Sequence, residues 1–179
     1  MLRRRIILVA ICAIVTLGAG GVFSSVHAES ETPMSQEHVD RIRANCIDAQ
    51  SSLSRLHASD ALLRVNRGQI YESILTKLMA PFNGRATTNR YDSATLITIT
   101  GDYERELNQF RASYISYEET LSDALTMNCT NQPVVFYDTV SDARAKREIV
   151  HSHTKKLETM ITSYQTSFET LAKTIESKL

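Results

Sequence analysis

Several side chains that could do acid–base chemistry interrupt apolar tracks in this sequence. His57 and Asp60 lie three residues apart, as do Arg144 and Arg147, and this spacing puts each pair on one face of a helix. Together with a tyrosine they could form a proton-transfer site, but groups of this kind more often neutralise one another in a structural layer. We therefore expect a buried polar layer, and no catalytic residue, at His57, Asp60, Tyr117, Arg144 and Arg147.

The other chemistry-bearing residues do not follow metal-binding or cofactor-binding patterns. His151 and His153 are two residues apart, a spacing at which helical side chains diverge, so we expect both at the surface. Cys46 and Cys129 are too far apart in the sequence for a C-x-x-C pair. The sequence contains neither a Gly-rich phosphate loop nor a nucleophile elbow. It therefore predicts no metal, no cofactor and no enzymatic activity.

One stretch is a candidate functional surface. Residues 62–72 carry many large polar side chains for what is predicted to be the middle of a helix. The members of this candidate surface are Arg64, Asn66, Arg67, Gln69, Tyr71 and Glu72.

Apolar periodicity shows which elements must position these residues. Two segments, 92–127 and 133–178, place apolar residues at alternating steps of three and four, the spacing of a coiled-coil seam. The β-branched residues 96–100 leave a short strand open as an alternative at the start of the first of them. The two seams are Tyr103, Leu107, Phe110, Tyr114, Tyr117, Leu121 and Ala124, then Leu157, Ile161, Tyr164, Phe168, Leu171 and Ile175.

A third helix is predicted over residues 35–82. Ser35 is a suitable N-cap, and Asn83 followed by Gly84 supplies a stop. Its track runs through Val39, Ile42, Cys46, Ala49, Leu53, Leu56, Asp60, Leu63, Arg67, Ile70, Ile74 and Leu78. The sequence thus predicts an all-α fold, an antiparallel three-helix bundle of long, coiled-coil-like helices.

The two cysteines test this topology. Residues at one height in an antiparallel hairpin have numbers with a constant sum, and the midpoint of Cys46 and Cys129 is 87.5. The turn predicted from periodicity alone, 83–90, is centred on 86.5. We therefore predict a Cys46–Cys129 disulfide, with two unpaired buried thiols as the alternative. The same register puts Asp60 level with residue 148, which predicts a contact with Arg147 or Arg144 and places Tyr117 nearby.

Residues 1–28 have the composition of a signal peptide. Arginines at positions 3–5 precede an apolar run, and Val26 and Ala28 form a small-residue cleavage site. Residues 6–23 also approach the length of a membrane span, so an uncleaved N-terminal anchor is the alternative. Both predictions place residues 29–179, a single helical-bundle domain, outside the cytoplasm: secreted, periplasmic or on the cell surface.

Charge composition limits the partners of this domain. It contains all 20 acidic residues and 17 of the 20 basic residues, with the two signs interspersed. This distribution argues against nucleic-acid binding and against membrane contact, except through the N-terminal segment if it is uncleaved. A rod of long helices offers side surface and little pocket volume, which suits contact with a protein partner whose identity the sequence does not indicate.

Two groups of residues resemble a known type of protein. The first contains Arg55, Leu56, His57, Asp60, Arg64, Val65, Asn66, Gly68, Gln69, Tyr71 and Glu72, and the second contains Pro133, Phe136, Tyr137, Ala143, Arg144 and Arg147. In these groups the chain resembles uncharacterised exported helical-bundle proteins of small-genome bacteria that live attached to a host. The resemblance implies a bacterial cell-surface setting and no known activity. We expect a non-catalytic extracytoplasmic binding or structural protein, with a membrane-anchored cell-envelope protein as the alternative.

Overall fold

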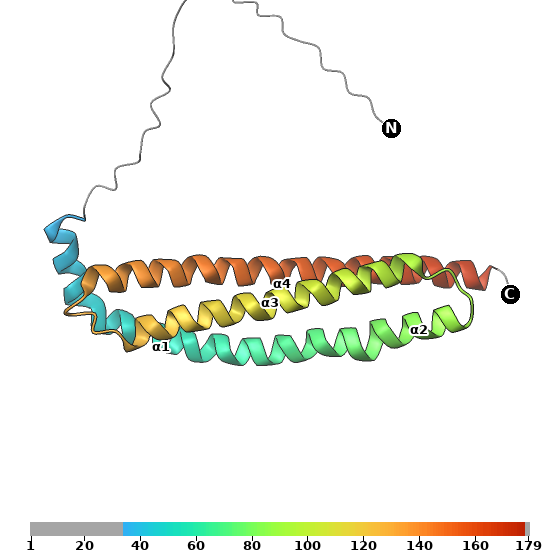
Figure 1. Ribbon diagram of the computed structural model, residues 1–179, viewed down its shortest axis with the longest axis horizontal. Helices are drawn as coiled ribbons and strands as arrows, with labels where there is room; N and C mark the ends of the chain where they lie inside the picture. Colours follow the sequence, from blue (N-terminus) through green and yellow to red (C-terminus); the bar gives the residue numbers. More distant parts are fainter. Residues whose placement is uncertain (1–33, 178–179) are drawn as a thin grey trace, which may run out of the picture. The chain divides into compact units, whose positions relative to one another are not determined.

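The computed structural model describes residues 34–177, and these form an all-α fold, as predicted (Figure 1). Its elements are α1 (Gln36–Ser73), a π-helical segment η1 (Ile74–Met79), α2 (Ala80–Thr88), α3 (Ala94–Thr126) and α4 (Pro133–Glu176). The described residues contain no strand, and residues 96–100 belong to α3. The predicted signal peptide or anchor, residues 1–28, lies outside the described residues.

Local sequence explains where the first and last helices begin. The Ser35 hydroxyl accepts a hydrogen bond from the backbone N–H of His38 at 3.3 Å, as expected for an N-cap. Pro133 opens α4, where its missing N–H would have had no partner within the helix. Both helix starts agree with the sequence prediction.

The predicted stop at Asn83 is wrong, because this side chain is used in the core. Asn83 is buried; it donates hydrogen bonds to the Thr100 hydroxyl at 2.7 Å and to the Leu96 carbonyl at 3.3 Å. Its amide oxygen accepts one from the Tyr164 hydroxyl at 2.9 Å. These tertiary bonds hold Asn83 inside α2, which therefore continues to Thr88.

The helix ends one and a half turns later through a backbone motif. The Tyr91 N–H bonds to the Ala86 carbonyl and the Arg90 N–H bonds to the Thr87 carbonyl, both at 3.0 Å. Arg90 has a φ of 60°, the left-handed conformation that this pair of bonds requires. Because an arginine stands where a glycine is usual, the sequence pattern did not indicate this helix end.

A π-helical segment lets the first helix pass through a proline. Pro81 has no N–H, and in a regular α-helix its ring would collide with the carbonyl four residues earlier. The wider turns of η1 precede it directly, and the Ala80 N–H bonds to the Leu75 carbonyl, five residues back. The chain thus stays helical from Gln36 to Thr88.

Helices α3 and α4 pack closely along their length and contain most of the core. All seven predicted seam residues of α3 are buried, from Tyr103 to Ala124. Tyr103 is fully buried, and its hydroxyl donates to the Tyr71 carbonyl of α1 at 3.1 Å. The buried tyrosines thus provide apolar bulk to the core and hydrogen bonds between helices.

The predicted track of the first helix fails in its second half. Leu63, Ile70 and Leu78 are 50%, 57% and 61% exposed, while Tyr71 and Met79 are buried in their place. A helix with 3.6 residues per turn drifts away from a strict seven-residue repeat, and the π-helical segment shifts the phase further. The inward face therefore moves by one residue, which leaves the predicted track at the surface.

Cys46 and Cys129 form the predicted disulfide. Their α-carbons are 5.8 Å apart, so the start of α1 is tied to the end of α3. Beside the bridge, the Gln50 side chain of α1 donates to the carbonyls of Ala124 and Met127 at 2.9 and 2.8 Å. These bonds satisfy the C-terminal carbonyls of α3, which the helix itself leaves without donors.

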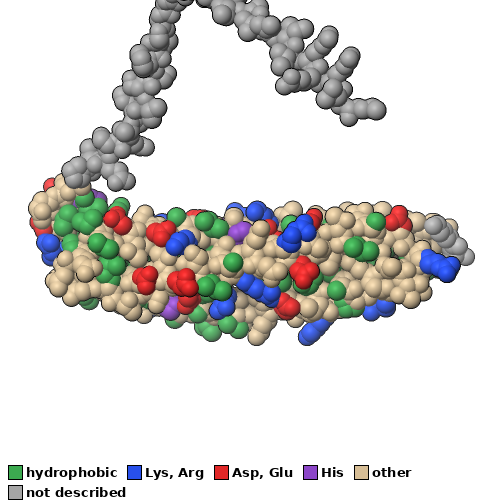
Figure 2. Space-filling view, in the orientation of Figure 1, with side chains coloured by type: hydrophobic (Ala, Val, Ile, Leu, Met, Phe, Trp, Pro, Cys, Tyr) green, Lys and Arg blue, Asp and Glu red, His purple; other side chains and the backbone are tan. Residues whose placement is uncertain are grey.

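The surface of the bundle is polar and mixed in charge. Figure 2 shows acidic and basic side chains interspersed on one face, without a large patch of either sign. Among residues 34–177, no helix is both long enough and apolar enough to cross a membrane.

Candidate functional site

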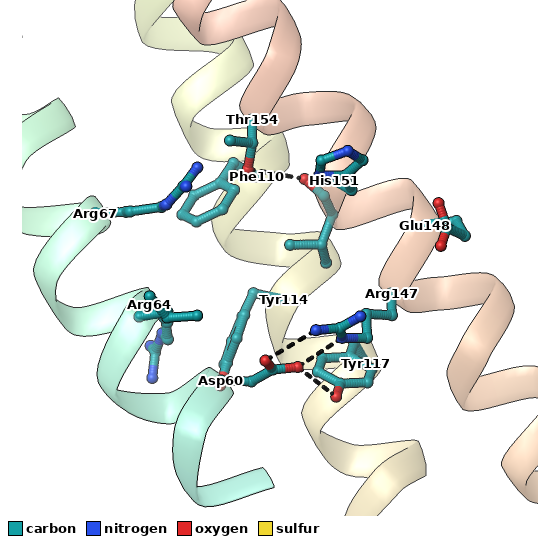
Figure 3. Close-up of a pocket in the computed structure, with 12 residues that line it drawn as sticks. Asp60, Arg64, Arg67, Phe110, Tyr114, Tyr117, Arg147, Glu148, His151 and Thr154 are labelled. Atoms are coloured by element: carbon teal, nitrogen blue, oxygen red, sulfur yellow. Dashed lines mark hydrogen bonds and ion pairs between the residues drawn. The ribbon is translucent and has the colours of Figure 1, made fainter. Parts of the chain in front are cut away.

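A polar layer joins α1, α3 and α4 near the middle of the bundle. Asp60 of α1 accepts hydrogen bonds from Arg147 of α4 at 2.7 and 3.1 Å, and from the hydroxyl of Tyr117 of α3 at 2.8 Å (Figure 3). Asp60 and Tyr117 are 8% and 2% exposed. The structure thus brings together three of the five residues predicted for this layer.

The three groups stabilise one another's charge states. Burial alone would raise the pKa of Asp60, but hydrogen bonds from Arg147 and Tyr117 and the charge of Arg147 outweigh it, so the pKa is lowered. The same hydrogen bond raises the pKa of Arg147. Burial and the adjacent carboxylate raise the pKa of Tyr117. At neutral pH, Asp60 is therefore a carboxylate, Arg147 is a cation and Tyr117 is a neutral donor.

The other two predicted members lie apart from Asp60. His57 donates its ring N–H to Glu118 of α3, with Nε2 and Oε1 2.5 Å apart. Arg144 is exposed and lines a separate depression beside Cys46 and Phe136. The prediction of one five-residue layer is therefore corrected to a three-residue layer, with a His57–Glu118 pair next to it.

A groove of about 420 Å³ opens above this layer, between α1, α3 and α4 (Figure 3). Its floor holds Asp60, Tyr117 and Arg147, and the Arg147 side chain is 46% exposed. The polar layer is therefore connected to solvent. Helix α1 contributes Leu63, Arg64 and Arg67 to the walls, α3 contributes Phe110 and Tyr114, and α4 contributes Glu148, Val150, His151 and Thr154.

Tyr114 forms the central wall of the groove. Its ring is buried, and the guanidinium carbon of Arg64 lies 4.8 Å from the ring centre, within the range of a cation–π contact. The Tyr114 hydroxyl and Oε2 of Glu118 are buried without a hydrogen-bond partner in residues 34–177. The two residues are four apart on α3, so a small side-chain rotation would bring these atoms together.

The candidate functional surface at residues 62–72 is divided among several faces of α1. Arg64 and Arg67 line the groove, and Tyr71 is buried against Phe110 with ring centres 5.8 Å apart. Glu72 forms an ion pair with Arg111 of α3. The remaining two residues, Asn66 and Gln69, line a different depression together with Ile70 and Leu78. The stretch is therefore not one continuous surface: only its two arginines belong to the groove, and its functional role stays a prediction.

Sequence reasoning missed a buried histidine–carboxylate hydrogen bond near the groove. His153 was expected at the surface, but it is buried and donates from Nδ1 to Oε1 of Glu106, with the two atoms 2.6 Å apart. Lys156 lies 3.6 Å from the same carboxylate oxygen. The predicted register of α3 and α4 places Glu106 within about one turn of His153. This register is the sequence signal from which the contact could have been predicted. His151 is exposed, as expected, and lines the groove.

Residues 34–177 contain no cluster of three or more histidine, cysteine or acidic side chains suited to a metal ion. Comparison with known proteins finds no matching family model, curated protein or solved structure. The family resemblance suggested by the sequence therefore stays a prediction.

Proposed function

We propose that this chain is an exported, non-catalytic binding protein whose binding site is the groove between α1, α3 and α4. The observation that carries the proposal is a solvent-connected groove with a rigid, satisfied floor. Preformed concave sites with a few fixed polar groups are typical of ligand recognition. The described surface has other depressions, one of them about 600 Å³ along α1 and η1, but none of these others has an ion pair in its lining.

The state of the polar layer favours binding over catalysis. Asp60 accepts three hydrogen bonds, and its lowered pKa leaves it without a proton to give at neutral pH. Arg147 and Tyr117 both hold their protons more tightly than usual. A general acid or base needs a pKa near the working pH. The layer is thus suited to fixing the three helices and the groove shape.

Export is part of the proposal and has its own support. A disulfide between Cys46 and Cys129 persists in oxidising compartments and is rare in the cytosol. The signal-peptide pattern of residues 1–28 agrees with such a location. Intact mass measurement of the protein recovered from cells tests this, because cleavage after Ala28 makes Glu29 the new N-terminus. If residues 1–28 are still present in the recovered protein, the membrane-anchored alternative is favoured.

A groove-filling variant tests the binding role. Leu63 lines the groove and is half exposed, so Leu63→Trp is expected to fill the groove without disturbing the core. Ala112→Trp is the matched control, because Ala112 is exposed on the side of α3 that faces away from Phe110 and Tyr114. Tagged wild-type and variant proteins would be used to capture partners from intact cells after cross-linking, with melting curves to check folding.

The proposed function predicts that Leu63→Trp abolishes capture of at least one specific partner that the control retains. Identical capture by both variants would contradict binding in the groove. If wild type captures nothing above a tag-only control and no small-molecule probe binds in the groove, the chain serves as a spacer and the binding role is wrong.

A further inference from the structure

We propose that the groove binds a small organic anion, a carboxylate or a phosphate monoester with an apolar or aromatic body, and that Arg64 and Arg67 hold its charged group. This inference rests on the proposed function and names the class of ligand. Its evidence is the charge balance of the lining, the pairing of the arginines, and the chemistry of the opposite wall.

The side chains that line the groove include more cations than carboxylates: three arginines against Asp60 and Glu148. Arg147 and Asp60 neutralise each other on the floor through paired hydrogen bonds. Glu148 belongs to the lining, but its carboxylate is directed away from the groove in Figure 3. The remaining charged side chains of the lining are Arg64 and Arg67, both cationic. A concave site with low-dielectric walls strengthens such a field.

Arg64 is free to accept an anionic partner. No carboxylate of the described residues lies within 4.0 Å of its guanidinium, which instead lies over the Tyr114 ring. A cation–π contact leaves the edge of the guanidinium and its N–H groups available. Arg64 can therefore donate two parallel hydrogen bonds to a carboxylate or phosphate.

Arg67 is held only loosely by the protein. Among the described residues, its single carboxylate partner is Glu158 at 3.4 Å, and the two side chains are 48% and 57% exposed. An exposed pair at this distance contributes little stability, so a ligand anion can replace Glu158 at small cost. Arg67 lies three residues after Arg64 on α1, and in Figure 3 its side chain extends across the groove toward Phe110.

The other walls are suited to an apolar body. The Phe110 and Tyr114 rings, with Leu63 and Val150, give the groove large apolar surfaces next to the arginines. A groove of about 420 Å³ can accommodate a small aromatic acid. The arrangement therefore discriminates in two ways: by charge at α1, and by an apolar surface formed by α3 and α4.

A titration of the isotope-labelled full chain with three related probes tests this inference. The probes are 3-phenylpropionate, phenyl phosphate and the uncharged 3-phenylpropanamide, each followed by backbone amide shifts at pH 7. We expect both anions to shift amides of the groove lining and the amide probe to bind at least tenfold more weakly. The stronger of the two anions then identifies the preferred charged group.

Three arginine variants complete the test. Arg64→Gln and Arg67→Gln should each weaken binding of the better anion by roughly ten-fold or more, the loss expected for a charge-assisted hydrogen bond. Arg55→Gln, at an exposed position of α1 outside the groove, should leave binding unchanged. If Arg55→Gln weakened binding of the anion as much as the two groove variants do, the loss would reflect the removal of any positive charge from α1. That result would overturn the inference.

The remaining outcomes separate this inference from the proposed function. Equal binding of 3-phenylpropanamide and 3-phenylpropionate in the groove would overturn the role of the arginines and leave the groove as a binding site. If no probe shifts the lining, the ligand class is wrong. The binding role is then decided by whether Leu63→Trp abolishes partner capture.

Discussion

Asp60 shows how one buried carboxylate can fix the positions of three helices. It accepts hydrogen bonds from α3 and α4 while it belongs to α1, so its replacement leaves two donors without their acceptor. We expect Asp60→Asn to lower the free energy of unfolding by about 1–3 kcal/mol, less than for a fully buried pair because Arg147 reaches solvent. Urea denaturation measures this. Asp48→Asn, at an exposed site of the same helix, should change stability by less than about 0.5 kcal/mol.

The stability of the protein should depend on pH through the same carboxylate. The pKa of Asp60 is lower in the folded protein than the value of about 3.9 in an unfolded chain. Its ionised form therefore stabilises the fold fully above pH 4–5, and this contribution is lost as pH falls through the folded pKa. The stability difference between wild type and Asp60→Asn should shrink as pH falls below about 4. A difference that stays constant from pH 7 to pH 3 would contradict this origin.

The buried Glu106 provides a second test at this scale. Its carboxylate accepts from His153 and lies near Lys156. Glu106→Gln removes the charge that both groups face, and we expect a loss of about 1–3 kcal/mol in the free energy of unfolding. Glu104→Gln is the matched control, because Glu104 is exposed on the same helix turn. Equal effects of the two changes in urea denaturation would show that the buried pair contributes nothing specific.

The two polar clusters differ in how far the sequence could predict them. Asp60 and Arg147 interrupt apolar tracks, so the pattern itself marked them, and helix register then paired them. Glu106 and His153 lie next to seam residues rather than on a seam. Their burial depends on how closely α3 and α4 approach, which a periodic pattern does not encode. Sequence reasoning therefore assigned His153 to the surface.

At the scale of elements, predictability follows the strength of local signals. The seam of α3 is correct throughout because α3 packs closely against α4 and its seam residues also contact α1. The end of the first helix was wrong because Asn83, a common stop residue, finds better hydrogen bonds in the core than at a cap. Tertiary contacts overrode a local preference there, and the π-helical segment before Pro81 made the continuation sterically acceptable.

The disulfide is the strongest single link between elements. It closes a loop over a sequence separation of 83 residues. Loop-entropy reasoning gives a contribution of roughly 4 kcal/mol, and the hydrogen bonds of Gln50 to the end of α3 lie beside the bridge. We expect Cys46→Ser/Cys129→Ser to remain helical by circular dichroism and to lose about 2–4 kcal/mol in urea denaturation. Dithiothreitol should destabilise wild type and leave the double variant unchanged. If dithiothreitol destabilised both wild type and the double variant, its effect would not come from reduction of this bridge.

For the molecule as a whole, the groove is a consequence of unequal packing. Helices α3 and α4 pack closely, whereas α1 approaches them at separated points. The disulfide holds one end, the Asp60 layer the middle, and the Asn83 hydrogen bonds with α3 and α4 the other end. Leu63 lies between the middle and the far end and remains half exposed, at the place where α1 leaves the space that the groove occupies. The periodic pattern predicted a continuous seam on each of the three helices. It could not predict that α1 contacts α3 and α4 only at separated points.

This unequal packing predicts an order of local opening. Backbone amides of α1 between Leu53 and Ser73 should exchange with deuterium at a lower free energy of opening than those of α3 between Tyr103 and Leu121, because α1 has fewer buried side chains to lose. Native-state hydrogen exchange with mass spectrometry measures this. Asp60→Asn should accelerate exchange in α1 around the polar layer and leave the centre of α3 unchanged. Uniform protection of both helices would show that the three rods open as one cooperative unit, and the groove would then lie on a rigid scaffold throughout.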